Sequence, residues 1–109
     1  MEAIVVLVTA PSPEKASAIA RAVVEERLAA CCNIVPGLRS FYWWEGKVQE
    51  DAEVLLLAKT ERALFERLRA RVVALHEYRC PEVIALPVAE GHAPYLEWIR
   101  GAVDTASAS

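Results

Sequence analysis

The order of strand-like and helix-like segments in this 109-residue sequence predicts an α+β fold built on an antiparallel sheet. Three observations support this class. Two apolar runs, residues 4–8 and 53–58, have the composition of central strands. Two longer segments place apolar side chains at three- and four-residue steps, which is typical of amphipathic helices. The pair Glu45-Gly46 directly joins two strand-like segments, as in a β-hairpin.

The chain is expected to begin with a strand at residues 3–8 and then a helix. Ser12 precedes the helical pattern and suits the N-cap position, while Pro13 suits the first turn. Helical spacing continues to about Leu28, where the helix is expected to end. Its apolar positions are Ala16, Ile19, Ala20, Val23, Val24 and Leu28.

A long hairpin is predicted next, with arms at about residues 31–44 and 47–59. Proline cannot donate to a sheet ladder, so Pro36-Gly37 predicts an edge strand with a bulge or bend. Gly46 provides the positive φ that a two-residue turn needs. The second arm is polar at first and strongly apolar near its end, as expected for a strand that enters the core.

The last part predicts a helix, an edge strand and a short helix. Thr60 is expected to cap the first of these helices. Residues 82–88 form the strand, and Pro87 places it at an edge. The last helix begins near Pro94. The second helix carries apolar residues at Leu64, Phe65, Leu68, Val72 and Leu75, and the last one at Leu96, Trp98, Ile99 and Val103.

This β-α-β-β-α-β order with an extra C-terminal helix predicts a ferredoxin-like sandwich. The first and third strands are then central, and the second and fourth lie at the edges. One domain is expected over residues 1–104, because a chain of this length forms a single core. Residues 105–109 are small and polar, and we expect a disordered tail there.

The hairpin arms are longer than the first strand by about six residues, so the hairpin should project roughly 20 Å beyond the sheet. It carries four consecutive aromatic residues, which are half of the eight in the chain. Side chains alternate along a strand, so Phe41 and Trp43 face one way while Tyr42 and Trp44 face the other. An isolated two-stranded ribbon is only marginally stable in water, and apolar side chains on it are expected to be buried against another protein surface. The hairpin therefore predicts a homo-oligomer.

Composition excludes several classes of protein. The net charge of −3 disfavours nucleic-acid binding, which normally requires a basic surface. The apolar run at the N-terminus is too short to span a bilayer and lacks a basic flank, so we expect no targeting segment and no membrane partner. The odd number of cysteines, three, argues against a disulfide framework. These features together predict a cytoplasmic protein.

Several spaced stretches resemble the CutA family, the divalent-cation tolerance proteins. They read LAACCNIVPGLRSFYWWEGKVQ, LLLAKT, HEYRCPEVIALPV and YLEWI, and the resemblance covers residues 4–103. It implies a ferredoxin-like fold in a tight homotrimer with the architecture of the PII signalling proteins, in which each hairpin pairs with the next subunit. It also implies a link to copper and other divalent cations, which we expect as partners. Copper or another divalent cation is then a ligand rather than an obligatory cofactor.

His76, Cys80 and Glu82 are the metal-ligand candidates. They fall in the segment that resembles the family's H-P-Y signature, where Glu77 replaces the usual proline. Imidazole, thiolate and carboxylate suit copper or zinc, although this spacing matches no strong metal motif. The alternative is that His76 simply ends a helix and the loop caps the sheet.

The resemblance further implies two metal ligands that this chain lacks. Copper-binding bacterial relatives can carry a cysteine late in the first strand and a second histidine just before the signature. Val8 and Leu75 occupy these positions here. Of the ligands implied in this way, His76 alone remains. Any metal would then bind weakly or differently, for instance through Cys80 and Glu82.

The remaining candidate residues fall into two groups. Tyr42, Trp44, Lys59 and Tyr78 are expected to line a cleft between subunits, and Phe41, Trp43, Gly46 and Trp98 to form the trimer interface. The alternative for Lys59 is a structural ion pair with Glu82 at the sheet margin. Cys31 and Cys32 are adjacent in a strand and point to opposite faces, so packing in the core or interface is favoured over a shared metal ion.

Three other functions are less compatible with this sequence. A PII-like signalling trimer would bind a small anionic ligand or a protein partner at its clefts, with Lys59 and Arg39 as contacts; the lack of a glycine-rich phosphate loop weakens it. An enzyme is not expected, because the sequence has neither the glycine-flanked arginine loop of acylphosphatases nor a nucleophile–base set. RNA recognition would need aromatic side chains on the central strands, which are aliphatic here.

Overall fold

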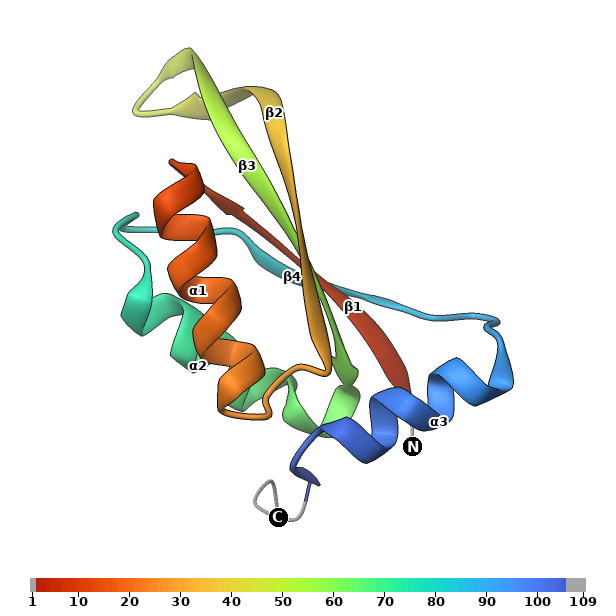
Figure 1. Cartoon of the computed structure of the whole chain (residues 1–109). Coiled ribbons are helices and arrows are strands. Elements are labelled where there is room, and N and C mark those ends of the chain that lie inside the picture. The colour runs from red at the N-terminus through yellow and green to blue at the C-terminus, as the bar shows by residue number, and fades with distance from the viewer. Residues whose placement is uncertain (1, 106–109) are drawn as a thin grey trace.

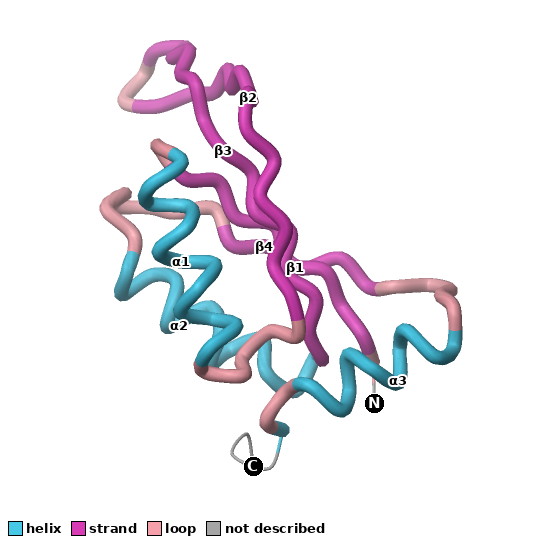
Figure 2. The backbone as a smooth tube through the Cα atoms, in the orientation of Figure 1, coloured by secondary structure: helices cyan, strands magenta, loops and turns pink. Residues whose placement is uncertain are grey.

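Four antiparallel strands form one sheet in the computed structural model, which describes residues 2–105 (Figures 1 and 2). The strands lie in the order β2-β3-β1-β4, so β1 and β3 are central and β2 and β4 are edges, as predicted. This confirms the α+β class and the order of the elements. The elements are β1 (Ala3–Ala10), α1 (Pro13–Glu25), β2 (Cys31–Trp44), β3 (Lys47–Glu61), a 3₁₀ turn (Arg62–Leu64), α2 (Phe65–Leu75), β4 (Val83–Pro87) and α3 (Ala93–Ala102).

The core lies between the sheet and the helices α1 and α2, which cover the same face (Figure 1). Along β1 every second residue is buried, because alternate side chains point into this layer. Helix α1 begins as predicted: Ser12 Oγ accepts from the backbone N–H of Lys15 at 3.1 Å, and Pro13 occupies the first turn. The largest fully buried side chains are Ile19, Leu56, Leu64, Leu68 and Ile99.

Two helix boundaries differ from the sequence-based expectation. Thr60 does not cap α2: it lies in β3, and its hydroxyl donates to the Leu28 carbonyl at 2.7 Å. Strand β3 continues to Glu61, and α2 follows a 3₁₀ turn without a side-chain cap. Helix α1 ends at Glu25 instead of near Leu28, because Arg27 adopts a φ of 58° and turns the chain.

The hairpin formed by β2 and β3 extends beyond the rest of the sheet, as predicted. Strand β1 pairs with β3 only as far as Val54, so within residues 2–105 the segments 38–44 and 47–53 pair solely with each other. Figure 1 shows this part of the hairpin projecting past α1. Its turn has positive φ at both Glu45 (52°) and Gly46 (77°), and the predicted irregularity occurs between Val35 and Leu38. The ribbon thus stands free of β1 in the single chain.

Large apolar side chains remain exposed on the hairpin, on β4 and on α3. Phe41 and Trp43 are 62% and 73% exposed, whereas Tyr42 and Trp44 on the other face are each 39% exposed. The others are Ile34, Val35, Val48, Ile84, Leu86, Tyr95 and Trp98, with Val24 and Val73 on α1 and α2. An uncovered apolar surface of this extent is typical of interaction surfaces, and the homo-oligomer stays a prediction.

No helix within residues 2–105 is long and apolar enough to cross a membrane. Of the predicted tail, residues 106–109 lie outside the described part of the chain.

Candidate functional site

A cleft of about 680 Å³ lies at the base of the projecting hairpin. It is formed by the end of β1, the hairpin strands and the loop between α2 and β4. Antiparallel pairing places Ser40, Tyr42 and Trp44 on one face of β2, and this face borders the cleft. The lining residues are Thr9, Ser40, Phe41, Tyr42, Trp44, Glu53, Glu77, Tyr78, Arg79, Cys80 and Glu82. The volume is within the range of small-molecule sites.

His76 anchors the loop that forms one wall of the cleft. Its ring is buried, and Nε2 lies 2.7 Å from the Thr9 carbonyl oxygen while Nδ1 accepts from the Tyr78 N–H at 3.1 Å. A carbonyl only accepts and an N–H only donates, so the ring is neutral with its proton on Nε2. Both nitrogens are therefore engaged within the chain, and His76 does not line the cleft.

Tyr78 connects this loop to the hairpin. Its ring lies 4.5 Å from the His76 ring, and its hydroxyl donates to Glu53 Oε2 at 2.7 Å. Burial first, and then the hydrogen bond to the Glu53 carboxylate, raise the pKa of Tyr78 well above its usual value. The phenol therefore remains a neutral donor, and the carboxylate of Glu53 is held in place at the cleft.

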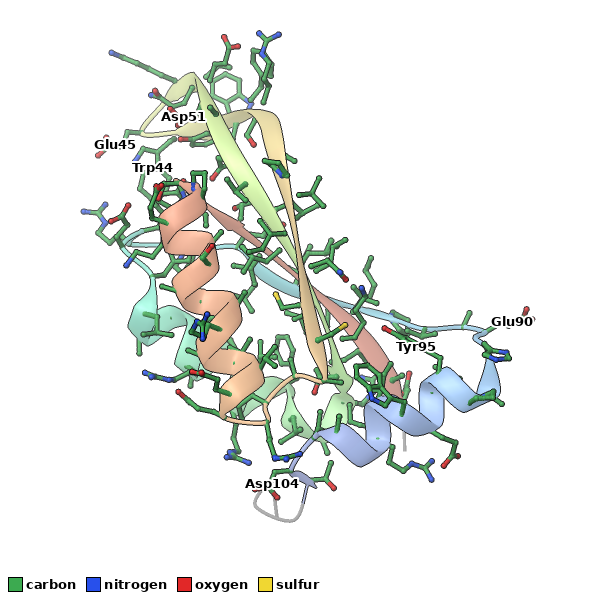
Figure 3. The ribbon with its side chains drawn as sticks, in the orientation of Figure 1. Trp44, Glu45, Asp51, Glu90, Tyr95 and Asp104 are labelled. Atoms are coloured by element: carbon green, nitrogen blue, oxygen red, sulfur yellow. The ribbon has the colours of Figure 1, made fainter. Side chains whose placement is uncertain are left out.

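The hairpin contributes a second tyrosine–carboxylate pair and an aromatic wall. Tyr42 donates its hydroxyl to Asp51, and this bond is the main reason that the pKa of Tyr42 is raised. The guanidinium carbon of Arg79 lies 5.8 Å from the centre of the Trp44 ring, within cation–π range. Figure 3 shows Trp44 and Asp51 on the hairpin and Tyr95 on α3, at the far end of the sheet.

The charge of the cleft is predominantly negative. Glu53, Glu77 and Glu82 line it together with one basic residue, Arg79, and the exposed thiol of Cys80. Carboxylate and thiolate are ligands for divalent cations. Within residues 2–105, however, no group of three or more His, Cys, Asp or Glu side chains is arranged to hold a metal ion. The cleft of a single chain therefore offers ligand types without a complete coordination set.

The two basic candidates lie elsewhere. Lys59 pairs with Val5 and Cys31 and donates to the Asn33 side chain, at the end of β3 away from the hairpin turn. Glu82 precedes Val83, which pairs with Val8 on the other side of β1. The ion pair considered for Lys59 and Glu82 is thus wrong. Arg39 also lies outside the cleft, because its side chain is bound to Glu50.

The other predicted residues either line the cleft or are exposed on the single chain. Tyr42, Trp44, Tyr78, Cys80 and Glu82 all line the cleft, and its position between subunits stays a prediction. The residues assigned to the trimer interface, Phe41, Trp43, Gly46 and Trp98, are all exposed on the single chain.

The neighbouring cysteines point in opposite directions, as predicted. Cys32 packs against the core, and burial together with the adjacent Cys31 raises the pKa of its thiol to about 11. Cys31 Sγ instead lies 3.6 Å from the Tyr95 hydroxyl. One metal ion cannot readily take both thiols.

Sequence reasoning missed Glu53 and Arg79 as residues of the cleft. Glu53 lies within β3 and directly precedes its apolar run, where a carboxylate resembles an ordinary solvent-facing residue. Its role depends on contact with Tyr78, twenty-five residues further along the chain. Arg79 follows Tyr78 directly and points to Trp44, a contact for which the sequence carries no periodic signal.

Comparison with known proteins gives a consistent result. The family model "CutA1 divalent ion tolerance protein" matches residues 4–102. A Thermus thermophilus protein described as "Divalent-cation tolerance protein CutA" is 60% identical over 96 residues, covering 88% of this chain and 93% of that protein. "Protein CutA 1, chloroplastic" from Oryza sativa is 55% identical over 97 residues, or 89% of this chain; the chain spans 55% of its length. Human "Protein CutA" is 49% identical, and the chain spans 57% of it.

Solved structures agree with the fold. The Thermus thermophilus divalent cation tolerance protein, Cut A1, superimposes with a TM-score of 0.92 at 57% identity, covering 94% of this chain and 99% of that one. CutA1 from Oryza sativa gives a TM-score of 0.93 at 51% identity, covering 95% of both chains. With a family match across nearly the whole chain and this level of identity, the protein described here belongs to the CutA1 family of divalent ion tolerance proteins.

Proposed function

We propose that the protein is a homotrimer that binds or responds to copper and other divalent cations in the cytoplasm, with no obligatory cofactor. Family membership supports a role in divalent-cation tolerance. The observation that carries the proposal is the acidic cleft beneath the hairpin, where Glu77, Cys80 and Glu82 follow one another closely on one loop. The three free thiols fit a reducing compartment.

Assembly is supported by the surface that the single chain leaves uncovered. Ile84 and Leu86 on β4 are about half exposed, and Phe41 and Trp43 are exposed further on the hairpin. Burying such side chains in a closed homo-oligomer removes apolar area from water without leaving a free edge. The element order supports the ferredoxin-like arrangement, in which three copies would pair their projecting hairpins.

The metal ligands in this proposal are Cys80 and Glu82, with Glu77 beside them. Cys80 and Glu82 are both exposed and line the cleft. One chain holds no complete set among its described residues, so the remaining ligands would come from the neighbouring subunit or from water. His76 serves this site by fixing the loop, since both of its ring nitrogens bind within the chain.

The second candidate, a PII-like trimer with an anionic ligand, gains no support from the cleft. Of the residues that line it, Arg79 alone is basic, and it faces three carboxylates. Lys59 and Arg39 are directed to Asn33 and Glu50 instead. A small anion would be repelled by this arrangement.

Calorimetric titration tests the metal site directly. Zn²⁺ and Cu²⁺ are titrated into the wild type and into Cys80→Ser and Glu82→Gln, with His92→Ala as a control for nonspecific binding to an exposed imidazole. We expect each loop variant to lose about tenfold in affinity while the control is unchanged. Equal affinity in all four proteins would contradict ligation by this loop. Retained Zn²⁺ binding by a folded His76→Asn variant would show that His76 positions the loop and is not a ligand.

A further inference from the structure

The cleft combines aromatic faces with carboxylates, and this pairing favours a different ligand from a bare metal ion. The rings of Tyr42, Trp44 and Tyr78 form part of its wall, and Glu53 lies among them. A positively charged nitrogen is attracted to the face of an aromatic ring and also to a carboxylate. A divalent metal ion depends chiefly on the second of these, because it is held by lone pairs on nitrogen, oxygen and sulfur ligand atoms.

The side chain of Arg79 already places a positive charge on an aromatic ring of the cleft. Its guanidinium lies over the ring of Trp44, and among the described residues it forms no ion pair with any of the three carboxylates. Its side chain is exposed. An exposed cation–π contact is weak, so Arg79 is a tethered cation that another can displace.

The carboxylate of Glu53 is fixed in advance. Tyr78 donates to Oε2, and Tyr78 is itself held by His76, whose ring is bound to β1 through Thr9. Oε1 accepts no hydrogen bond among the described residues and remains available to a donor. A site ordered before binding loses less conformational entropy when the ligand enters.

We propose that the cleft binds a small organic dication, with one ammonium or guanidinium group on the ring of Trp44 in place of Arg79 and the other paired with Glu53, which stands six residues beyond Lys47, the strand partner of Trp44. The volume of about 680 Å³ admits a molecule of this size. The site goes beyond the metal proposal and does not require that a metal bind. Its determinants, Trp44 and Glu53, differ from the loop ligands Cys80 and Glu82.

Agmatine, which carries one ammonium and one guanidinium group, is a suitable probe. It is titrated into the purified full chain in the presence of a chelator, and binding is followed by calorimetry. We expect saturable binding of agmatine and none of succinate, a dianion of similar length, because the cleft is acidic. Sodium chloride at the same ionic strength is titrated as the blank. If the heat measured for agmatine does not exceed that of the blank, the proposal is overturned.

Matched variants locate the site. Trp44→Leu and Glu53→Gln are expected to weaken agmatine binding about tenfold. Trp43→Leu removes the neighbouring ring on the opposite face of the hairpin, and Glu45→Gln removes a carboxylate at its turn; both should bind as the wild type does. Mass and unfolding temperature are measured for each variant, so that only folded proteins of the same size are compared. Equal effects of Trp43→Leu and Trp44→Leu would contradict the site.

Arg79→Ala gives the most specific readout. If Arg79 competes for the face of Trp44, its removal strengthens agmatine binding several-fold, whereas a simple structural role for Arg79 would weaken it. Cys80→Ser should weaken agmatine binding far less than Trp44→Leu does, while it weakens Zn²⁺ binding about tenfold. The amine site and the metal site are therefore tested separately, and failure of one does not imply failure of the other.

Discussion

The hydroxyl of Tyr78 donates a 2.7 Å hydrogen bond to Glu53, and so ties the loop after α2 to the base of the hairpin. The link continues inward, because the Tyr78 N–H donates to His76 and the His76 ring binds the carbonyl of Thr9. Three separate segments of the chain, β1, β3 and the loop, are thereby held at one end of the sheet. This connection gives the cleft its shape.

Tyr78→Phe should lower the free energy of unfolding by about 1 kcal/mol, because it removes a hydrogen bond to a charged acceptor and leaves Glu53 without its donor. Denaturant unfolding at a fixed protomer concentration measures the change. Tyr95→Phe is the control, since the one hydrogen bond of its hydroxyl to the described residues is with the weak partner Cys31 Sγ. A Tyr78 variant no less stable than the Tyr95 variant would contradict a structural role for this bond.

Alkaline pH should destabilise the protein through Cys32. Burial raises the pKa of this thiol from 9.0 to about 11 in the folded chain. The unfolded chain therefore releases the proton first, and the stabilising contribution, complete below about pH 9, is lost as the pH rises to about 11. Cys32→Ala should flatten this decline in unfolding experiments, whereas Cys80→Ala should not. Parallel declines in both variants would argue against this assignment.

The same burial predicts unequal reactivity of the thiols. Only the thiolate is nucleophilic, and Cys32 stays protonated near neutral pH while Cys80 is exposed. We expect a disulfide reagent at pH 8 to modify Cys80 rapidly and Cys32 at least about tenfold more slowly. Kinetics on Cys80→Ser and Cys32→Ala assign the phases. If the fast phase survives in Cys80→Ser and disappears in Cys32→Ala, the prediction is wrong.

Glu61 carries a cost in stability that substitution can remove. It is 3% exposed, and its Oε1 is buried without a hydrogen-bond partner among the described residues. An unpaired buried polar atom destabilises a fold, so Glu61→Met should raise the free energy of unfolding by about 1 kcal/mol. Glu90→Met, at an exposed position, is the control. A less stable Glu61 variant would show that this carboxylate finds a partner in the assembled protein.

Much of the fold was predictable because it depends on local patterns. Proline at 36 and 87 placed β2 and β4 at the edges, and alternation along β1 placed its buried face. The position of Thr60 was not predictable in this way. As an N-cap candidate it has the right local sequence, but the Leu28 carbonyl, thirty-two residues earlier, accepts its hydroxyl instead. A contact between distant segments overrode the local preference.

The candidate site was predictable in part for the same reason. Aromatic residues on a projecting strand identified Tyr42 and Trp44, and the loop motif identified Tyr78, without any knowledge of contacts. The position of Lys59 at the end of an apolar strand suggests a place in the cleft, yet the register puts it beside Val5, away from the cleft. The role of Glu53 was not predictable, because it depends on a contact between the hairpin and Tyr78 in the loop. Sequence patterns therefore predicted the aromatic residues of the site, but not that acidic side chains outnumber basic ones in the cleft.

Assembly through the hairpin underlies the proposed metal response, and light scattering coupled to size exclusion tests it most directly. The exposed Phe41 and Trp43 should be covered by neighbouring chains. At micromolar protein we expect a single species with three times the mass of the 12.0 kDa chain. A charge on this surface, as in Trp43→Glu, should shift the mass towards that of one chain. A wild-type protein that elutes as a 12.0 kDa monomer at this concentration would contradict the account.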